Sequence, residues 1–382
     1  MVAITLEGVT VRYRGQPDAR AALEDVSLDI ASGELVVLAG PSGSGKTTVL
    51  RTIAGLEQPV RGRVLIDGRD VSGTPPAGRD VAMVTQAHSL FPHLTVEQNL
   101  TFALRLRKVP EDETRRRVAA EARVLGLWSK LRARPRTLSS GERQRAAVGR
   151  ATTRRPAIYL FDEPLASLDA AERERVRREL RRLQRGLRVT TVYVTHDQRE
   201  AMALGDRIAV LDEGRLVQVA EPLMLYRRPR TLFVAQFFGS PPMGVLRGAL
   251  RDDGSTAWLD IAGAPLRLPP AQRDAVAGHA VGDLLAVGLR SSAVHLGAQA
   301  SPPWSRRLDL VVAGREPLGP TTVVALAPPG TRRPYDVLYA SVEPNRHLVR
   351  GDPVVASIDM SDSYLFDAST GRRLYPTEQH TA

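Results

Sequence analysis

The sequence predicts two domains, an α/β domain with an inserted helical subdomain over residues 1–238 and an all-β domain over residues 239–382. Three observations support this prediction. An apolar, partly β-branched run at 34–39 precedes a Gly/Ser-rich loop and a helix, the order found in parallel α/β sheets. Apolar residues recur at helical spacing between about 87 and 150. After residue 243, short β-like runs alternate with Gly/Pro turns.

Length and composition exclude several classes of protein. The 382 residues allow two or three domains, and fractions of 43% hydrophobic and 25% charged residues are typical of a soluble globular chain. The absence of cysteine removes disulfides, thiolate metal sites and cysteine nucleophiles. The N-terminal residues lack the features of a signal peptide, and the longest uncharged windows, 81–96 and 231–246, are too short to span a bilayer. We therefore expect the protein to stay inside the cell.

The net charge of +11 is carried almost wholly by arginine. A basic surface is compatible with nucleic-acid binding. However, the arginines at 173–188 are interleaved with glutamates in a segment of helical character, which favours a solvated, ion-paired helix face. We expect no nucleic-acid partner.

Residues 40–48, GPSGSGKTT, match the phosphate-binding pattern G-x-x-x-x-G-K-[ST]. In such a loop, backbone N–H groups surround a phosphate, and the following helix adds the positive end of its dipole. Lys46 is expected to neutralise the β- and γ-phosphates, and Thr47 to ligate Mg²⁺. The alternative is an accidental Gly/Ser-rich turn. The candidate phosphate-binding residues are Ser42, Gly43, Ser44, Gly45, Lys46, Thr47 and Thr48.

Strands are expected on both sides of this loop. Residues 4–6, 9–13 and 22–30 predict a small antiparallel sheet, and residues 81–85 a short buried strand. Tyr13 lies where an aromatic ring could stack on a base, although a lone tyrosine on a strand is more often simple packing. Gln86 follows the end of a strand, where it could reach Mg²⁺ or an attacking water.

Two acidic residues follow the apolar run at 157–161. Asp162 is expected to hold Mg²⁺, and Glu163 to polarise the water that attacks a γ-phosphate. A further strand at 188–194 leads to His196, which could touch the γ-phosphate or be structural. Ser139 and Glu142, three residues apart, predict a capping box at the start of a helix.

Together these motifs resemble the ordered motif set of an ABC transporter ATPase. The resemblance rests on the phosphate-binding loop, Gln86, LSSGE at 138–142, the acidic strand end at 162–163, SLD at 167–169, and His196. It implies a P-loop nucleotide-binding domain that uses ATP and Mg²⁺, with His196 contacting the γ-phosphate. The commonest form of the family signature is L-S-G-G-Q, so Ser140 and Glu142 depart from it.

The resemblance also implies partners. Family members form a head-to-tail dimer, so each ATP would lie between the phosphate-binding loop of one subunit and Ser139 and Gly141 of the other. A side chain at Gly141 would then lie against the phosphate. Asp169 would couple the two sites. The segment from Gln86 to Gln98 would face a membrane permease, which places the protein on the cytoplasmic face of the plasma membrane.

Segments 233–243 and 364–374 resemble the ATPases of bacterial importers of the maltose and glycerol-3-phosphate type. In that subfamily the C-terminal domain has an oligonucleotide/oligosaccharide-binding (TOBE-type) fold and carries dimer and regulatory contacts. The implied function is ATP hydrolysis coupled to carbohydrate uptake, with an extracytoplasmic solute-binding protein acting through the permeases. An importer of an inorganic ion or a polyamine, and a nucleic-acid-associated ABC ATPase, are the alternatives.

Overall fold

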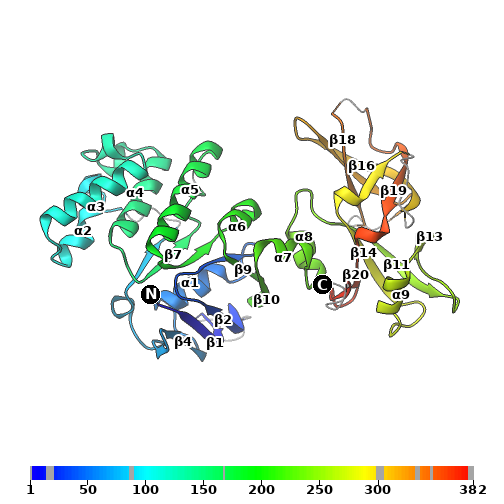
Figure 1. Cartoon of the computed structure of the whole chain (residues 1–382), viewed down its shortest axis with the longest axis horizontal. Helices are drawn as coiled ribbons and strands as arrows, with labels where there is room; N and C mark the ends of the chain where they lie inside the picture. Colours follow the sequence, from blue (N-terminus) through cyan, green and yellow to red (C-terminus); the bar gives the residue numbers. More distant parts are fainter. Residues whose placement is uncertain are drawn as a thin grey trace. The chain divides into compact units, whose positions relative to one another are not determined.

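The computed structural model describes residues 2–13, 21–85, 90–166, 168–297, 305–331, 336–344 and 347–376. The chain forms two compact units, Met1–Pro222 and Leu223–Ala382 (Figure 1). No helix in the described ranges is long and apolar enough to cross a membrane.

The first unit contains two sheets, as expected from the sequence. An antiparallel sheet has the strand order β2-β1-β4-β5. A larger sheet has the order β10-β9-β3-β8-β7-β6 and is parallel except for the β9–β10 hairpin. The strands are β1 (Ile4–Val11), β2 (Leu23–Ile30), β3 (Leu35–Ala39), β4 (Arg61–Ile66), β5 (Arg69–Asp70), β6 (Val81–Val84), β7 (Ile158–Asp162), β8 (Thr190–Val194), β9 (Arg207–Asp212) and β10 (Arg215–Ala220).

Helix α1 (Lys46–Ala54) follows β3 and the phosphate-binding loop. Its residues Val49, Leu50 and Ile53 are buried in a core shared with strands of both sheets. This packing fixes the start of α1 at the carboxyl end of β3. Strand β8 pairs in parallel with both β3 and β7, so the carboxyl ends of all three strands lie at the same edge of the sheet.

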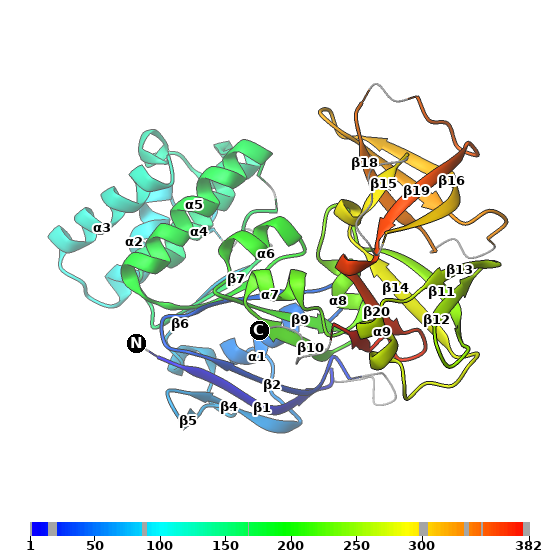
Figure 2. The same ribbon diagram turned by 45° about the vertical axis from the view of Figure 1, so that its right-hand side comes forward.

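The expected helical subdomain is present between β6 and β7. Helices α2 (Val96–Leu106), α3 (Glu111–Val124) and α4 (Ser140–Thr153) lie side by side in both views (Figures 1 and 2). Short 3₁₀ turns occur at Pro76–Gly78, Trp128–Lys130 and Pro135–Thr137. Helix α5 (Ala170–Leu187) follows β7, and α6 (Gln198–Leu204) follows β8.

The second unit is mainly β-structure, and all of its paired strands in the described ranges are antiparallel. Its sheets have the orders β13-β12-β11-β14-β20-β21 and β15-β19-β16-β17-β18, and together they form a nearly closed, barrel-like region. The strands are β11 (Gly244–Asp252), β12 (Ala257–Ile261), β13 (Ala264–Arg267), β14 (Leu284–Leu289), β15 (Val294–Leu296), β16 (Ser305–Pro317), β17 (Thr322–Ala327), β18 (Leu338–Val342), β19 (Pro353–Asp359), β20 (Ser363–Asp367) and β21 (Arg373–Tyr375), with α9 at Pro270–Ala275 and 3₁₀ turns at Ser291–Ala293 and Met360–Asp362.

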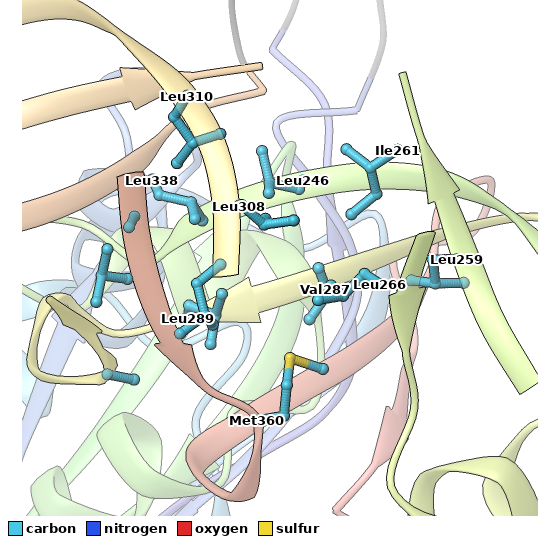
Figure 3. Packing of buried hydrophobic residues seen from close by; sticks show 14 of the residues in the cluster. Leu246, Leu259, Ile261, Leu266, Val287, Leu289, Leu308, Leu310, Leu338 and Met360 are labelled. Atoms are coloured by element: carbon cyan, nitrogen blue, oxygen red, sulfur yellow. The ribbon is translucent and has the colours of Figure 1, made fainter. Parts of the chain in front are cut away.

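One apolar core joins the two sheets of this unit. Leu246, Leu259 and Val287 from the first sheet pack in one cluster with Leu310 and Leu338 from the second (Figure 3). The all-β prediction for the C-terminal part of the chain is therefore confirmed.

The division between the units precedes the expected boundary at 238–239. Helices α7 (Pro222–Arg227) and α8 (Leu232–Phe237) connect the units, and α8 groups with the second. Leu232 and Ala235 of α8 pack on Met243 and Phe366. The buried guanidinium of Arg290 donates to the Ala235 and Phe238 carbonyls at 3.0 and 2.6 Å. These contacts explain why α8 belongs with the β-structure.

We expect truncation after Pro222 to give a soluble, ATP-binding fragment, because the first unit has its own core. A fragment that ends at residue 239 should be less soluble, because it keeps the apolar face of α8 without its partners. Burial of one leucine side chain is worth roughly 1.5–3 kcal/mol. Size-exclusion chromatography and ATP titration of both fragments test this. Aggregation of residues 1–222 where the full chain is soluble would contradict it.

Candidate functional site

A cavity of about 570 Å³ opens at the carboxyl edge of the parallel sheet in the first unit, and we call it the nucleotide cavity. It brings together residues from the strand β1 end, the phosphate-binding loop, and the ends of β7 and β8. The lining residues are Tyr13, Ala22, Ser42, Gly43, Gly45, Lys46, Thr47, Thr48, Glu163 and His196.

The phosphate-binding loop has a backbone that only glycine accommodates at two positions. Gly40 and Gly45 have φ values of 150° and 100°. A Cβ atom at Gly40 would lie 2.1 Å from the Leu211 carbonyl oxygen, and one at Gly45 would lie 2.8 Å from that of Ala22. The glycines of the motif are therefore needed for close packing of the loop against its neighbours, besides any approach of a ligand.

Lys46 is the cation of the cavity wall. Its Nζ donates to the carbonyl oxygens of Gly40 and Pro41 at 2.9 and 2.6 Å. Burial lowers the pKa of Lys46, and the carboxylates of Glu163 and Asp162 oppose this effect. The ammonium group is thus held against the loop beside two acidic residues, where a triphosphate would find a positive charge.

Thr47 and Asp162 supply two oxygen atoms next to each other. The Thr47 hydroxyl donates to Asp162 Oδ1 at 3.1 Å, and burial raises the pKa of the Asp162 carboxyl. The described residues contain no group of three or more His, Cys, Asp or Glu side chains that could hold a metal ion alone. Mg²⁺ in phosphate sites binds one or two protein oxygens together with phosphate and water, so this pair fits Mg²⁺ carried with a nucleotide.

Glu163 and His196 follow the ends of the paired strands β7 and β8 and meet in the cavity. Glu163 Oε1 lies 3.0 Å from His196 Nδ1. The Glu163 side chain is 19% exposed and that of His196 is 61% exposed, so the imidazole covers a more enclosed carboxylate. Glu163 has a φ of 47°, and its N–H donates to the Val194 carbonyl at 3.0 Å. The backbone therefore turns sharply at Glu163, directly after β7.

Tyr13 also lines the cavity, where its hydroxyl is hydrogen-bonded to the Thr48 hydroxyl at 2.9 Å. The side chain stays 46% exposed. This contact ties the end of β1 to the start of α1. Ala22 is a lining residue that sequence reasoning missed, and no signal in its residue type could have found it.

The ABC transporter family matches residues 23–166. The sn-glycerol-3-phosphate import ATP-binding protein UgpC 1 of Rhizobium etli is 43% identical over 98% of this chain and 99% of its own length. The chain belongs to the ABC transporter ATP-binding proteins. The trehalose/maltose import ATP-binding protein MalK of Thermococcus litoralis is 42% identical over 93% of this chain and 95% of its own length.

Among solved structures, the dimeric ATP-binding cassette MJ0796 in a post-hydrolysis state with ADP and Pi is 31% identical. It covers 57% of this chain and 98% of its own, with a TM-score of 0.54. An Atm1-family ABC exporter with ATP bound is 29% identical over 59% of this chain and 40% of its own, with a TM-score of 0.52. This protein is thus an ABC-type transporter ATPase, and its nucleotide is ATP.

Several residues expected at the ATP site of this ABC protein lie outside its nucleotide cavity. Ser139 caps α4, where its hydroxyl accepts a hydrogen bond from the Glu142 N–H at 3.1 Å. Asp169 caps α5, where its carboxylate accepts one from the Glu172 N–H at 2.8 Å. Ser44 is buried under the loop, with its hydroxyl 3.4 Å from Lys46 Nζ. Two expected motif residues, Gln86 and Ser167, lie outside the described residues.

Glu142 completes the capping box that the sequence predicted. Its carboxylate accepts from the Ser139 N–H at 2.8 Å and lies 3.2 Å from Lys130 Nζ. The hydrogen bond from the Ser139 backbone lowers the pKa of Glu142. The departure from the commonest signature therefore strengthens the helix cap, because a carboxylate replaces an amide near the positive end of α4.

The space beside Gly141 is filled by the same chain, which the sequence did not indicate. A Cβ atom there would lie 2.6 Å from Glu172 Oε2 and 3.0 Å from Leu168 Cδ2. Gly141 therefore permits close packing of α4 on the start of α5, in addition to the expected approach of a phosphate.

We expect Gly141→Asp to nearly eliminate ATP turnover, because the new carboxylate would lie beside that of Glu172 and, in the dimer that the resemblance implies, against the phosphate of the partner's ATP. Ser140, the residue before Gly141, is exposed. Ser140→Gly should therefore change turnover by less than about tenfold, which corresponds to ~1.4 kcal/mol in the activation free energy. Phosphate release by each full-length variant measures this, with ATP affinity and melting temperature as controls. Normal turnover by Gly141→Asp, or a hundredfold gain by Ser140→Gly, would contradict the assignment.

Proposed function

We propose that this ABC ATPase powers the import of sn-glycerol 3-phosphate or a related carbohydrate. The observation that carries the proposal is similarity to import ATP-binding proteins over nearly the whole chain, including the β-rich second unit. The names of these relatives refer to glycerol 3-phosphate and to trehalose and maltose.

The geometry of the nucleotide cavity supports the residue roles in hydrolysis. Lys46 would hold the β- and γ-phosphates, and Thr47 with Asp162 would hold Mg²⁺, which neutralises phosphate charge when bound. Glu163 would polarise the attacking water and accept its proton. His196, 3.0 Å from Glu163, would orient that carboxylate and contact the γ-phosphate. Tyr13, with its exposed side chain, would stack on the base.

A second copy of the chain, or a paired ATPase subunit, would complete the site. Ser139 and Gly141 stand at the start of α4, whose N–H groups and dipole suit a phosphate. Ser139 is exposed and outside the nucleotide cavity of its own chain. Together with the dimeric state of MJ0796, this supports contact with an ATP bound by the partner, with Asp169 coupling the sites.

A groove on the helical subdomain supports docking of a permease. The expected docking segment is 86–98, of which residues 90–98 are described. A groove of about 370 Å³ continues from this segment along α2, where Phe102 is 38% exposed and Leu106 is 71% exposed. The groove is lined by His93, Leu94, Gln98, Phe102, Arg105 and Leu106. Such docking would hold the protein at the cytoplasmic face of the membrane and connect it indirectly to a solute-binding protein.

Uptake by cells tests the proposed solute class. Cells of the source organism that lack the gene would be compared with cells that carry the wild-type gene or Lys46→Ala, using labelled glycerol 3-phosphate, maltose and trehalose. We expect uptake of at least one solute to be lost and to be restored only by the wild-type gene. Unchanged uptake of all three, with loss of polyamine or inorganic-ion uptake, would favour the alternative importer classes.

A further inference from the structure

Two turns at the edge of the parallel sheet are joined by one arginine of α5. The first turn contains Leu168 and Asp169 and leads into α5. The second is at residues 195–197 and carries His196 between β8 and α6. Arg173, one turn into α5, reaches both.

The guanidinium of Arg173 makes a different contact with each turn. Its Nη2 donates to the Leu168 carbonyl at 3.0 Å. Its Nη1 lies 3.7 Å from Asp197 Oδ2, within ion-pair distance. The planar guanidinium presents donors in fixed directions, so one side chain can serve both acceptors, which a lysine ammonium cannot do with the same geometry.

Asp197, which contacts Arg173, is held in place by three hydrogen bonds of its own. Its Oδ1 accepts from the N–H groups of Arg199 and Glu200 at 2.8 and 3.2 Å, which caps α6. Its own N–H donates to the Thr195 hydroxyl at 3.0 Å. His196 therefore lies between two residues that are both fixed by hydrogen bonds.

Glu200, in helix α6, also holds the turn at 195–197 by hydrogen bonds. It is 4% exposed, and its carboxylate accepts from the Thr195 hydroxyl and, at 2.8 Å, from the Tyr193 hydroxyl. The turn is thus tied to β8 and to α6, and movement of Asp197 would carry His196 with it.

We propose that Arg173 is a positioning residue that makes the turn bearing His196 move together with the turn bearing Asp169. This rests on the proposed function, in which Asp169 couples two ATP sites and His196 contacts the γ-phosphate. Contact of a second subunit at Asp169 would reach His196 through Leu168, Arg173 and Asp197, without passing through the phosphate-binding loop.

A double-mutant cycle on the full chain tests this connection. Arg173→Met keeps an unbranched stem at this position but removes the N–H donors and the charge of the guanidinium. Asp197→Asn keeps the cap of α6, because asparagine is also a good N-cap, but removes the charge. We expect each substitution to lower kcat by about tenfold, and the double variant to be no slower than the slower single variant, whereas independent effects would multiply to about a hundredfold.

Two further readouts separate positioning from general damage. ATP affinity should change by less than about threefold in each variant, because neither residue lines the nucleotide cavity. The imidazole NMR signal of His196, assigned with His196→Gln in ¹³C-histidine-labelled protein, should shift in Arg173→Met. Arg182→Met is the matched control, since Arg182 is on the same helix, is 77% exposed and pairs only with Glu179 among the described residues.

Three results would each overturn the proposal. The first is a loss of kcat in the double variant equal to the product of the two single losses. The others are an unshifted His196 signal in Arg173→Met and a loss of kcat in Arg182→Met equal to that in Arg173→Met. Glu163→Gln assayed in parallel separates this outcome from failure of the proposed function. If Glu163→Gln hydrolyses ATP normally, the catalytic roles proposed for Glu163 and the adjoining His196 fail. If it is inactive while Arg173→Met is as active as the wild type, only the role of Arg173 fails.

Discussion

Glu163→Gln should lower the rate of ATP hydrolysis by at least about a thousandfold, while ATP still binds. This loss corresponds to ~4 kcal/mol in the activation free energy. The amide has the shape of the carboxylate but cannot take up the proton of the attacking water. Glu163 follows β7 directly, is 19% exposed, and lies 3.0 Å from His196. It is the one carboxylate among the described residues that line the nucleotide cavity. Phosphate release at saturating ATP and nucleotide binding by fluorescence would be measured together.

Glu121→Gln is a matched control for this substitution. Glu121 is another largely buried glutamate of the first unit, and it accepts a hydrogen bond from the Thr152 hydroxyl at 3.0 Å in the helical subdomain. Burial raises the pKa of Glu121, so an uncharged amide suits its surroundings. We expect its turnover to stay within about threefold of the wild type. Equal losses in both variants would show that Glu163 has no special role.

Lys46→Ala should weaken ATP binding by at least about a hundredfold, or ~2.8 kcal/mol. Among the described residues that line the nucleotide cavity, the substitution removes the one lysine or arginine. It also removes the hydrogen bonds that Nζ donates to the carbonyl oxygens of Gly40 and Pro41. Isothermal titration with Mg-ATP measures the affinity directly.

Lys108→Ala removes the same charge from an exposed position after α2 and should leave ATP affinity unchanged. Equal affinities of Lys46→Ala and the wild type would refute the assignment of the phosphate-binding loop.

The sequence predicted the local parts of the site because each is encoded by a short pattern. The phosphate-binding loop, the acidic end of β7 and the cap at Ser139 depend on residues within a few positions of one another. The signal at Lys46 needed only the spacing of its glycines. These features needed no knowledge of what packs against them.

The features that the sequence did not predict depend on contacts between distant segments. The bond between Tyr13 and Thr48 and the neighbours of Gly141 join elements whose register is fixed only by the folded core. The division of the compact units at Pro222 also differs from the expected boundary at 238–239. The apolar residues of α8 give the same sequence pattern whichever unit buries them. Their packing on Phe366 shows that the helix belongs with the β-structure.

Two copies of this chain are expected to bind and hydrolyse ATP as a pair, with one nucleotide cavity in each copy. Light scattering of full-length Glu163→Gln with Mg-ATP, with bound nucleotide quantified in the same peak, tests it most directly. We predict a particle of twice the chain mass of 41.6 kDa that carries one unhydrolysed ATP per chain, and a single-chain mass for Lys46→Ala. A single-chain particle that holds ATP, or a dimer that forms equally without nucleotide, would contradict the claim.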